Sequence, residues 1–430
     1  MTSLDIGLLG LCATLTLVIF GAPVGAVLGL VAFAGLALVL GLGPALSMSV
    51  SLPFEFIADW SISAIPMFIL MGYIAAESGI AASVFKLMRM ALVRLPGGLA
   101  CASVGACAIF ASASGSSLAT AAAMGRVCIP EMRAAGYKDS LATGCIASAG
   151  TLGSLIPPSI LLIIYAYFAN VSVSAVFLAA VIPGVASAAL YASMIISRAT
   201  ISPDLAPRST ESFSRDEVIE TVKRVFYFPL LVTVVLGGIF MGIVTPTEGG
   251  AVGAAAATLI AVLVYDMSLK QLWTTCLESV RSSCTIFFIA IGAVIYARFV
   301  SITGIPGFIT DALSSDSPSV WLFIIQVSII MIILGMFIDA ISLLLIMLPV
   351  FVPLASAVGV DLIWFGIVVI KLCEIGLVTP PVGMNVYVIS GVAGKDVQIT
   401  SIFKGAAWFI LMDVLVILLL LAFPAAMTLQ

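Results

Sequence analysis

The chain contains no histidine among its 430 residues, and only 9% of its residues are charged. The absence of histidine excludes His metal ligands, histidine proton relays and the usual serine or cysteine catalytic triads. A soluble domain carries about 25% charged residues, whereas hydrophobic residues make up 62% of this chain. The composition therefore predicts an integral membrane protein. The net charge of −4 and the lack of a basic cluster give no indication of nucleic-acid binding.

Three further motifs are missing. The eight cysteines form no CxxC pair and lie mostly in apolar context, so we interpret them as small core residues rather than disulfides or metal ligands. The first apolar stretch lacks a basic n-region and an Ala-x-Ala cleavage site, which favours a retained membrane span over a signal peptide. No ATP-binding sequence of the Walker type is present, so any transport would depend on an ion gradient.

Prolines recur in the two halves of the chain at a constant offset of 223 residues. The offset relates Pro23, Pro130, Pro157 and Pro158 to Pro246, Pro353, Pro380 and Pro381, respectively. In lipid, non-helical backbone is tolerated only where it lines a cavity or is buried in protein. Hydrophobic segments interrupted by Gly and Pro at corresponding places in two halves indicate the binding site of a secondary transporter.

Apolar runs divide the chain into two halves of similar order, because a bilayer core of about 30 Å needs roughly 20 apolar residues per helix. The first half, 1–197, is predicted to begin with scaffold helices in 1–96, namely spans 5–20, 23–42 and 62–78 and a semi-polar stretch 80–96. The region 98–168 follows, with a hairpin of half-length segments 98–112 and 114–130 and a broken span 138–168. A full span, 172–197, ends this half. A polar linker covers 198–224 and is expected to end in a short amphipathic helix.

The second half, 225–430, repeats this order. Its scaffold region 225–315 is predicted to hold spans 225–243, 246–266 and 280–299 and a short element 305–315. The region 318–391 follows, with half-length segments 318–338 and 340–357 and a broken span 361–391. The last span is 400–426. The expected fold is all-α, a polytopic membrane protein with inverted-topology repeats, two re-entrant helical hairpins and two broken helices.

The distribution of Lys and Arg predicts the orientation, because short cytoplasmic loops carry an excess of both. With the linker on the cytoplasmic side, most basic residues of short loops fall on that side and both termini become periplasmic. Arg298 falls near the opposite face, and Arg126 is expected to extend to the cytoplasmic surface rather than to substrate. The residues expected to be cytoplasmic are Lys86, Arg89, Arg94, Arg133, Lys138, Lys270, Arg281, Lys395 and Lys404.

The first candidate site is the tip of the first hairpin, where Ser112, Ser114, Gly115, Ser116 and Ser117 interrupt an apolar run. A half-helix N-terminus offers free N–H groups and a positive dipole end, which suit a carboxylate, and the preceding C-terminus offers carbonyl oxygens, which suit Na⁺. The alternative is that these small residues only allow helices to pack closely.

The second candidate site is the sequence GTLGSLIPPS at 150–159. Pro157 removes a backbone donor and clashes with the carbonyl four residues earlier, near Gly153. Gly150 and Gly153 tolerate unwound backbone, while Thr151 and Ser154 add hydroxyl oxygens. A ligand set of oxygen atoms alone suits a hard cation.

The second half offers a matching pair, with Gly335 and Asp339 at its tip and EIGLVTPPVGMN at its break. Asp339 and Glu374 are functional candidates because ionisable residues are costly within a membrane. Lys371 precedes Glu374 by three residues and shares its helix face. Two alternatives stay open for Lys371: a neutralising ion pair, or a contact with an anionic substrate. Asp413 is a candidate hydrogen-bond partner between helices, and we assign it no functional role.

Several stretches resemble the large membrane subunit of tripartite ATP-independent periplasmic (TRAP) transporters, the DctM type. The resemblance covers nearly the whole chain in order. The stretches are IPMFILMGYIAAESGI, SGSSLATAAAMGRVCIPEM, GTLGSLIPPSILLIIY, GIVTPTEGGAVG, LGMFIDAISLLLIMLPV and EIGLVTPPVGMNVYV.

The resemblance implies a Na⁺-coupled importer of a small organic acid anion in the bacterial inner membrane. It implies an elevator-type transporter in which hairpins and broken helices slide against a scaffold, with no cofactor other than coupling sodium ions. The implied partners are a small four-helix membrane subunit (DctQ type), expected as a separate chain, and a periplasmic substrate-binding protein (DctP type). The acid could be a C4-dicarboxylate, a sugar acid, sialic acid, a sulfonate or a keto acid.

Carried over by motif, two sets of residues follow from the resemblance. The sodium-binding set is Ser112, Ser114, Gly115, Ser117, Gly150, Thr151, Gly153, Gly335, Asp339, Gly376 and Thr379. The substrate is expected between the two tips, with Ser116, Ser154, Pro157, Pro381, Asn385 and Lys371 as candidate contacts.

Other functions remain as alternatives. A stand-alone sodium- or proton-coupled carrier of organic anions would need no binding protein, and Asp339 and Glu374 could titrate in it. An intramembrane protease is disfavoured because Tyr265-Asp266 has no GxGD partner and a serine enzyme would lack its histidine base. A purely structural scaffold would not explain two broken helices.

Overall fold

Every element of secondary structure that the structure describes is helical. The structure is a computed structural model, and it describes residues 1–207, 211, 213–313, 320–394 and 396–428. Seven of the described helices are long and apolar enough to cross a membrane, or eight if the bent pair Asp139–Leu155 and Ile160–Ala169 is one span. The prediction of an all-α membrane protein is confirmed.

In the first half, one group of helices precedes the hairpin formed by α6 and α7, and a second group follows it. In order they are α1 (Ser3–Ile19), α2 (Val24–Leu40), α3 (Leu42–Ala58), η1 (Trp60–Ser63), α4 (Ala64–Glu77), α5 (Ile80–Leu92), α6 (Gly98–Ser114), α7 (Ser117–Ala134), α8 (Asp139–Ala149), α9 (Leu152–Leu155), α10 (Ile160–Ala169), α11 (Val173–Ile201) and η2 (Pro203–Leu205).

The second half begins after the amphipathic helix α12 (Arg215–Val225), which the sequence predicted. The remaining helices are α13 (Tyr227–Phe240), α14 (Pro246–Leu263), α15 (Leu269–Thr303), α16 (Ile305–Leu313), α17 (Val320–Gly335), α18 (Ala340–Val358), α19 (Leu362–Val378), α20 (Met384–Ala393), α21 (Ile399–Ala422) and α22 (Pro424–Thr428).

The repeating prolines occupy matching places in these helices. Pro23 is the N-cap of α2 and Pro246 is the first residue of α14, so both begin a helix. The Pro157–Pro158 and Pro380–Pro381 bonds are both cis and lie between α9 and α10 and between α19 and α20. The boundaries of the two halves as units, their opposite insertion, the re-entrant nature of the hairpins and the periplasmic termini stay predictions. Lys395, expected to be cytoplasmic, lies outside the described residues.

Two expectations about the scaffold were wrong. No helix was expected between 43 and 61, yet α3 fills this interval, because Pro44, Pro53 and Glu55 lower its hydropathy without preventing a helix. The span expected at 280–299 is the middle of the 35-residue helix α15. Glu278 and Arg281 end the apolar run there, but a helix can continue through charged positions that face a cavity.

Other boundaries also differ from the sequence prediction. The hairpin α6–α7 turns at Gly115 and Ser116, and α7 continues past Pro130 to Ala134 instead of ending there. The polar linker was expected from residue 198, but α11 continues to Ile201. A proline inside a helix removes one hydrogen bond, and neighbouring helices can supply the packing that keeps the helix continuous.

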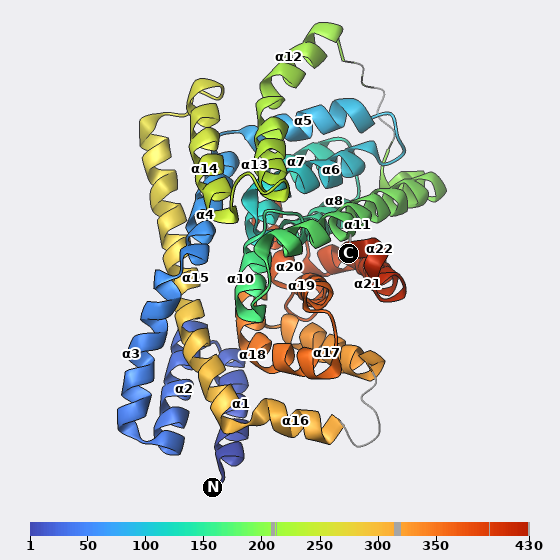
Figure 1. The fold of residues 1–430 in the computed structure, drawn as a ribbon. Coiled ribbons are helices and arrows are strands. Elements are labelled where there is room, and N and C mark those ends of the chain that lie inside the picture. The colour runs from blue at the N-terminus through green and yellow to red at the C-terminus, as the bar shows by residue number, and fades with distance from the viewer. Residues whose placement is uncertain (208–210, 212, 314–319, 395, 429–430) are drawn as a thin grey trace.

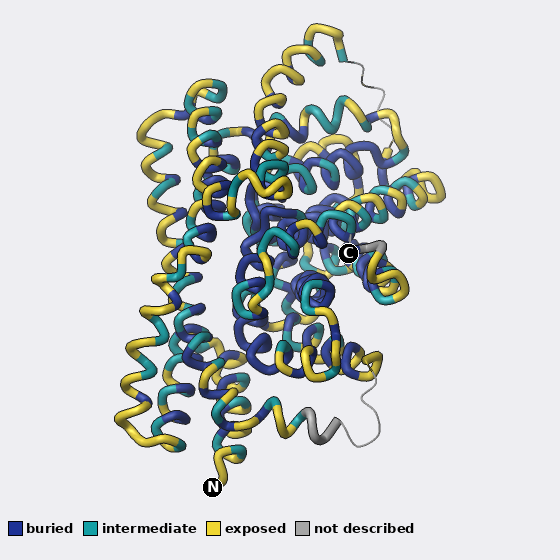
Figure 2. Tube along the Cα trace, in the orientation of Figure 1, coloured by how far each residue is buried: buried dark blue, intermediate teal, exposed yellow. Residues whose placement is uncertain are grey.

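The long helix α15 runs along one side of the molecule beside α3 and α4 (Figure 1). The remaining helices form a body against it, with the hairpin α6–α7 towards one end, the hairpin α17–α18 towards the other, and α10, α19 and α20 between them (Figure 1). Burial is concentrated in this body, while the outer faces of α3 and α15 are largely exposed (Figure 2). Exposed apolar faces on long helices suit contact with lipid.

Small residues allow the helix backbones to approach closely. A Cβ on Gly292 of α15 would lie 2.4 Å from the carbonyl oxygen of Gly25 in α2. A Cβ on Gly405 of α21 would lie 1.8 Å from the carbonyl oxygen of Ser140 in α8. Close backbone approach is typical of helix packing in membranes, where lipid-facing side chains gain little from hydrophobic burial.

Candidate functional site

The first hairpin turns through a single left-handed glycine. Helix α6 ends at Ser114, and Gly115 adopts a φ of 58°, which few residues other than glycine tolerate. Ser116 is the N-cap of α7, and its hydroxyl accepts a hydrogen bond from the Ala119 N–H at 3.5 Å. The hydroxyls of Ser114 and Thr120 lie 2.5 Å apart and brace the turn. The tip therefore presents the N-terminus of α7 behind a neutral serine cap.

The first break packs directly on this tip. The Ile160 N–H donates to the Gly115 carbonyl oxygen at 3.2 Å. A Cβ on Gly153 would lie 2.6 Å from the Ser116 carbonyl oxygen, and one on Gly150 would lie 2.6 Å from the Ala121 side chain. Both contacts need glycine. The structure thus brings together the two first-half segments that the sequence analysis singled out, 112–117 and 150–154.

The hydroxyls around the first break are mostly engaged with nearby carbonyls. Ser112 donates to the Ile109 carbonyl at 2.6 Å, and Thr151 donates to the Ser148 carbonyl at 2.7 Å. The hydroxyls of Ser148 and Ser154 are buried and have no hydrogen-bond partner among the described residues. A buried unpaired polar group costs about 1–3 kcal/mol, so these two oxygens are suited to receive a ligand. The sequence analysis included Ser154 and missed Ser148.

The second tip repeats the arrangement with a carboxylate. Asp339 is the N-cap of α18 and accepts from the Ser342 N–H at 3.0 Å; at the offset of 223 it corresponds to Ser116. A Cβ on Gly376 would lie 2.7 Å from the Gly335 Cα, so α19 and the end of α17 touch backbone to backbone. The Thr379 hydroxyl donates to the Ile375 carbonyl at 2.6 Å. Gly335 and Gly376 therefore touch, whereas the hydrogen bonds of Asp339 and Thr379 are to residues of α18 and α19.

The candidate substrate contacts do not all lie at the tips. Ser116 lines a cavity between the tip and the scaffold, and Pro157 is buried in the first break whereas Pro381 is exposed in the second. The Asn385 side-chain amide donates to the Ala147 carbonyl at 3.0 Å and is completely buried, so it ties α20 to α8.

Lys371 forms the ion pair that one of its two alternatives predicted. Its ammonium lies 2.8 Å from Glu374 and 2.6 Å from Asp413, and all three side chains are fully buried. The Tyr191 hydroxyl donates to Asp413 at 2.5 Å. This cluster joins α19, α21 and α11. The sequence could not assign Asp413 this contact because its partner stands 42 positions away on another helix.

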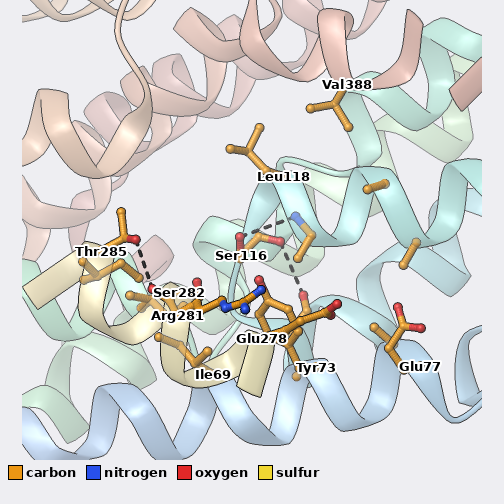
Figure 3. A pocket seen from close by; sticks show the side chains of 18 of the residues that line it. Ile69, Tyr73, Glu77, Ser116, Leu118, Glu278, Arg281, Ser282, Thr285 and Val388 are labelled. Atoms are coloured by element: carbon orange, nitrogen blue, oxygen red, sulfur yellow. Dashed lines mark hydrogen bonds between the residues drawn. The ribbon is translucent and has the colours of Figure 1, made fainter. Parts of the chain in front are cut away.

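A cavity of about 700 Å³ separates the first tip from the scaffold (Figure 3). Ser114 and Ser116 line it from the tip, Tyr73 from α4 and Arg281 from α15. The second half also contributes apolar side chains from α18 and α20, namely Ile341 and Val388. The two hairpin systems therefore share one cavity wall.

Sequence reasoning missed Arg281 and Tyr73 as cavity residues. Arg126, expected to extend to the surface rather than to substrate, has an exposed side chain. Arg126 lines the same cavity and pairs with Glu77 at 3.4 Å. Arg281 was expected at the cytoplasmic end of a span that begins at residue 280, because the apolar run starts there. The signal that could have corrected this is the capping box at Ser268 and Gln271, which marks the true start of α15.

The apolar helices, the two hairpins and the broken helices are typical of a multi-pass membrane transport protein. A family model described as "Tripartite ATP-independent periplasmic transporter, DctM component" matches residues 11–426, and the chain belongs to this family. The chain is 35% identical over 379 residues to the C4-dicarboxylate TRAP transporter large permease protein DctM of Pseudomonas aeruginosa, with 87% of each chain covered. It is 32% identical over 338 residues to the 2,3-diketo-L-gulonate TRAP transporter large permease protein YiaN of Escherichia coli, with 78% of each covered.

Relatives also include a longer protein and more distant structures. The sialic acid TRAP transporter permease protein SiaT of Haemophilus influenzae is 28% identical over 366 residues, which cover 85% of this chain and 59% of SiaT. The structure is similar to that of MtrF of Neisseria gonorrhoeae, with a TM-score of 0.64, 15% identity and coverage of 89% and 85%. For the YdaH transporter of Alcanivorax borkumensis the TM-score is 0.62, with 13% identity and 89% coverage of each. These two similarities show the fold.

Proposed function

We propose that this chain is the translocation subunit of a sodium-coupled, binding-protein-dependent importer of a small organic acid anion. The observation that carries the proposal is the junction of each hairpin tip with a helix break, formed by Gly115 and Gly153 in the first half and by Gly335 and Gly376 in the second. Such junctions bring helix ends and hydroxyl oxygens to one point inside an apolar protein.

The first junction supports a sodium site because its ligands are oxygen atoms alone. The hydroxyl of Ser154 is buried and unpaired, and backbone carbonyls of Gly115 and Ser116 lie at the contact with the break. Na⁺ is a hard cation, for which carbonyl and hydroxyl oxygens are suitable ligands. The second junction adds the Asp339 carboxylate, which would neutralise a bound cation. The described residues contain no cluster of three or more Cys, Asp or Glu that could hold a metal ion.

The substrate is proposed to bind in the cavity beside Ser116. The N-terminus of α7 faces this cavity behind the serine cap, and a helix N-terminus favours a carboxylate. The relatives named above carry C4-dicarboxylate, 2,3-diketo-L-gulonate and sialic acid in their names. All three compounds are organic acids, and a cavity that favours a carboxylate suits the same class of compound.

An elevator movement is proposed for transport. The end of α6 touches the scaffold at Gly72, where a Cβ would lie 2.7 Å from the Ser114 Cα. A tip that slides along α4 and α15 would carry its ligands with it and change the side from which they are reached. Glycine at the contact keeps the sliding surface free of side chains that would interlock.

A sodium gradient supplies enough free energy for accumulation. Each charge moved down 100 mV yields about 2.3 kcal/mol, and a tenfold Na⁺ gradient adds about 1.4 kcal/mol per ion. Two Na⁺ with a monoanion would release roughly 5 kcal/mol, and with a dianion about 3 kcal/mol because no net charge moves. The partners proposed from the family are a small membrane subunit and a periplasmic binding protein, and the location is the bacterial inner membrane.

The test is uptake by proteoliposomes that contain this chain and its small subunit. A thermal-shift screen of the cognate binding protein first identifies the acid, and uptake of that labelled acid is then measured with and without an inward Na⁺ gradient. The proposal expects uptake only with the gradient and only with the binding protein present. Uptake without the binding protein would favour the stand-alone carrier, and uptake driven equally well by a proton gradient without Na⁺ would exclude sodium coupling.

A further inference from the structure

Two arginines of the described part of the chain, Arg126 and Arg281, line the shared cavity, and only the first has an ion pair within that part. Arg126 pairs with Glu77, whereas Arg281 makes no ion pair or side-chain hydrogen bond among the described residues. Glu278 precedes Arg281 by three residues on α15 and also lines the cavity, yet the two side chains form no ion pair. Figure 3 shows the Arg281 side chain extending from α15 into the space below Ser116.

Arg281 lies well inside its helix. It is twelve residues after the start of α15, which corresponds to about 18 Å along the axis. Its side chain is exposed and lines the cavity wall, and it has no ion pair among the described residues. The position of Arg281 in the cavity wall is therefore a reason to look for an anionic ligand there.

The wall opposite Arg281 also favours negative charge. Ser114 and Ser116 lie there, with the N-terminus of α7 behind them. An arginine guanidinium binds a carboxylate through two parallel N–H···O bonds, which a lysine cannot reproduce. A ligand with an anionic group at each end would meet a favourable partner on both walls.

Some residues of the first half correspond, at the offset of 223, to residues in this cavity wall, and they line a different cavity. Another cavity, of about 450 Å³, is lined by Asp59 and Ile62, which correspond to Ser282 and Thr285 at the offset of 223. The residue that corresponds to Arg281 is Ala58. None of the described residues that line this second cavity is Lys or Arg. The counterpart of Arg281 is thus an uncharged alanine, and the charged side chain that lines the second cavity among the described residues is the acidic Asp59.

We propose that Arg281 binds the second carboxylate of a dicarboxylate whose first carboxylate lies at the N-terminus of α7. The inference rests on the proposed function and adds a specificity-determining residue to it. Because Arg281 belongs to α15 and not to the hairpin, it contacts the substrate only while the tip is beside this cavity. A monocarboxylate of the same length gains nothing from Arg281, so the chain selects dianions over monoanions in this state.

Equilibrium binding to the purified complex in Na⁺ buffer tests the inference, with succinate and butyrate as probes of equal chain length. Wild type should bind succinate more tightly than butyrate. Arg281→Gln should weaken succinate binding about 10- to 100-fold, as expected for loss of a hydrogen bond between charged groups. Butyrate binding should change by less than about twofold. Arg281→Lys should be intermediate.

Arg298→Gln is the matched control, because Arg298 is exposed on the same helix and lines none of the described cavities named here. It should behave as wild type. Unchanged succinate affinity in a folded Arg281→Gln protein would overturn the inference, as would a wild type that binds succinate no better than butyrate. Sodium-driven uptake by wild type is measured separately, so a failure of the inference leaves the proposed function standing.

Discussion

The two broken helices share a backbone plan and differ in chemistry. Both end at a cis Pro–Pro bond, and both approach a hairpin tip through a glycine. The first carries Ser148 and Thr151 where the second carries Lys371 and Glu374. The first break is buried among hydroxyls, whereas Pro380 and Pro381 of the second are exposed.

This difference separates two roles that a duplicated element can take. The hydroxyls of the first break leave the buried oxygens of Ser148 and Ser154 unpaired and available to a ligand. The charges of the second anchor α19 to α21 and α11 through Lys371 and Asp413. The same backbone geometry therefore carries neutral buried hydroxyls in one half and a buried ion-pair cluster in the other.

Lys371→Met should have the largest effect on stability. It leaves Glu374 and Asp413 buried without their shared cation, and breaking a buried ion pair costs about 3–5 kcal/mol. Ser148→Ala at the corresponding position should be neutral or stabilise by up to about 1–3 kcal/mol, because it removes a buried hydroxyl that has no partner among the described residues. Unfolding in detergent, followed by heat or denaturant, measures both. Lys404→Met, at an exposed position, is the control. Equal losses in the Lys371 and Ser148 variants would contradict the proposed contrast.

Gly376→Ala should have the next largest effect on stability. Its Cβ would lie 2.7 Å from the Gly335 Cα, and forced overpacking typically costs about 1–3 kcal/mol. Gly153→Ala should act similarly in the first half, because its Cβ would lie 2.6 Å from the Ser116 carbonyl oxygen. Thermal stability and Na⁺-dependent uptake should both fall. Gly391→Ala, in α20 with open space around it, should leave both unchanged. Full activity in the first two variants would show that these junctions are not close-packed.

Asp339→Asn tests whether the charge of Asp339 makes the second hairpin tip bind Na⁺ differently from the first, which has the neutral Ser116 at the same place. The amide can still cap α18, but the negative charge that would balance a bound cation is lost, so the Na⁺ concentration for half-maximal uptake should rise about tenfold. Ser116→Ala, at the corresponding position, removes a neutral cap and should raise it less. Sodium activation curves in proteoliposomes give both values. A larger effect at Ser116 than at Asp339 would reverse the comparison.

Ser117→Ala and Thr379→Ala should have the smallest effects, one in each half. Each removes a single neutral hydroxyl near a proposed sodium site, which is worth about 0.5–1.5 kcal/mol or roughly two- to tenfold in Na⁺ affinity. The readout is again the sodium activation curve, with the maximum rate unchanged. Unchanged activation in both variants would refute the placement of the ion sites.

Local sequence signals predicted much of the fold. Apolar runs located most membrane helices, and the repeated prolines located both breaks, because proline removes a backbone donor wherever it stands. The helix α3 was missed because Pro53 and Glu55 resemble loop signals when their neighbours are unknown. The start of α15 was missed because hydropathy was weighed above the capping signal at Ser268.

The candidate site divides along a similar line. Residues near one another in sequence, such as Ser114 and Ser116 or Lys371 and Glu374, could be grouped from spacing alone. Spacing could not predict that the Asn385 amide donates to the Ala147 carbonyl, because this bond joins α20 to α8, 238 positions away in sequence. The substrate contact expected for Asn385 stays a prediction.

By itself the sequence determined that the chain enters a membrane, that its halves are interrupted at matching places, and that oxygen-rich segments lie at those interruptions. These properties depend on composition and on bonds between close neighbours. Only the tertiary structure decided that Asp413 completes the Lys371 ion pair and that Arg281 faces the first hairpin tip. Such contacts join distant residues, and they depend on how whole helices cross, which no local pattern encodes.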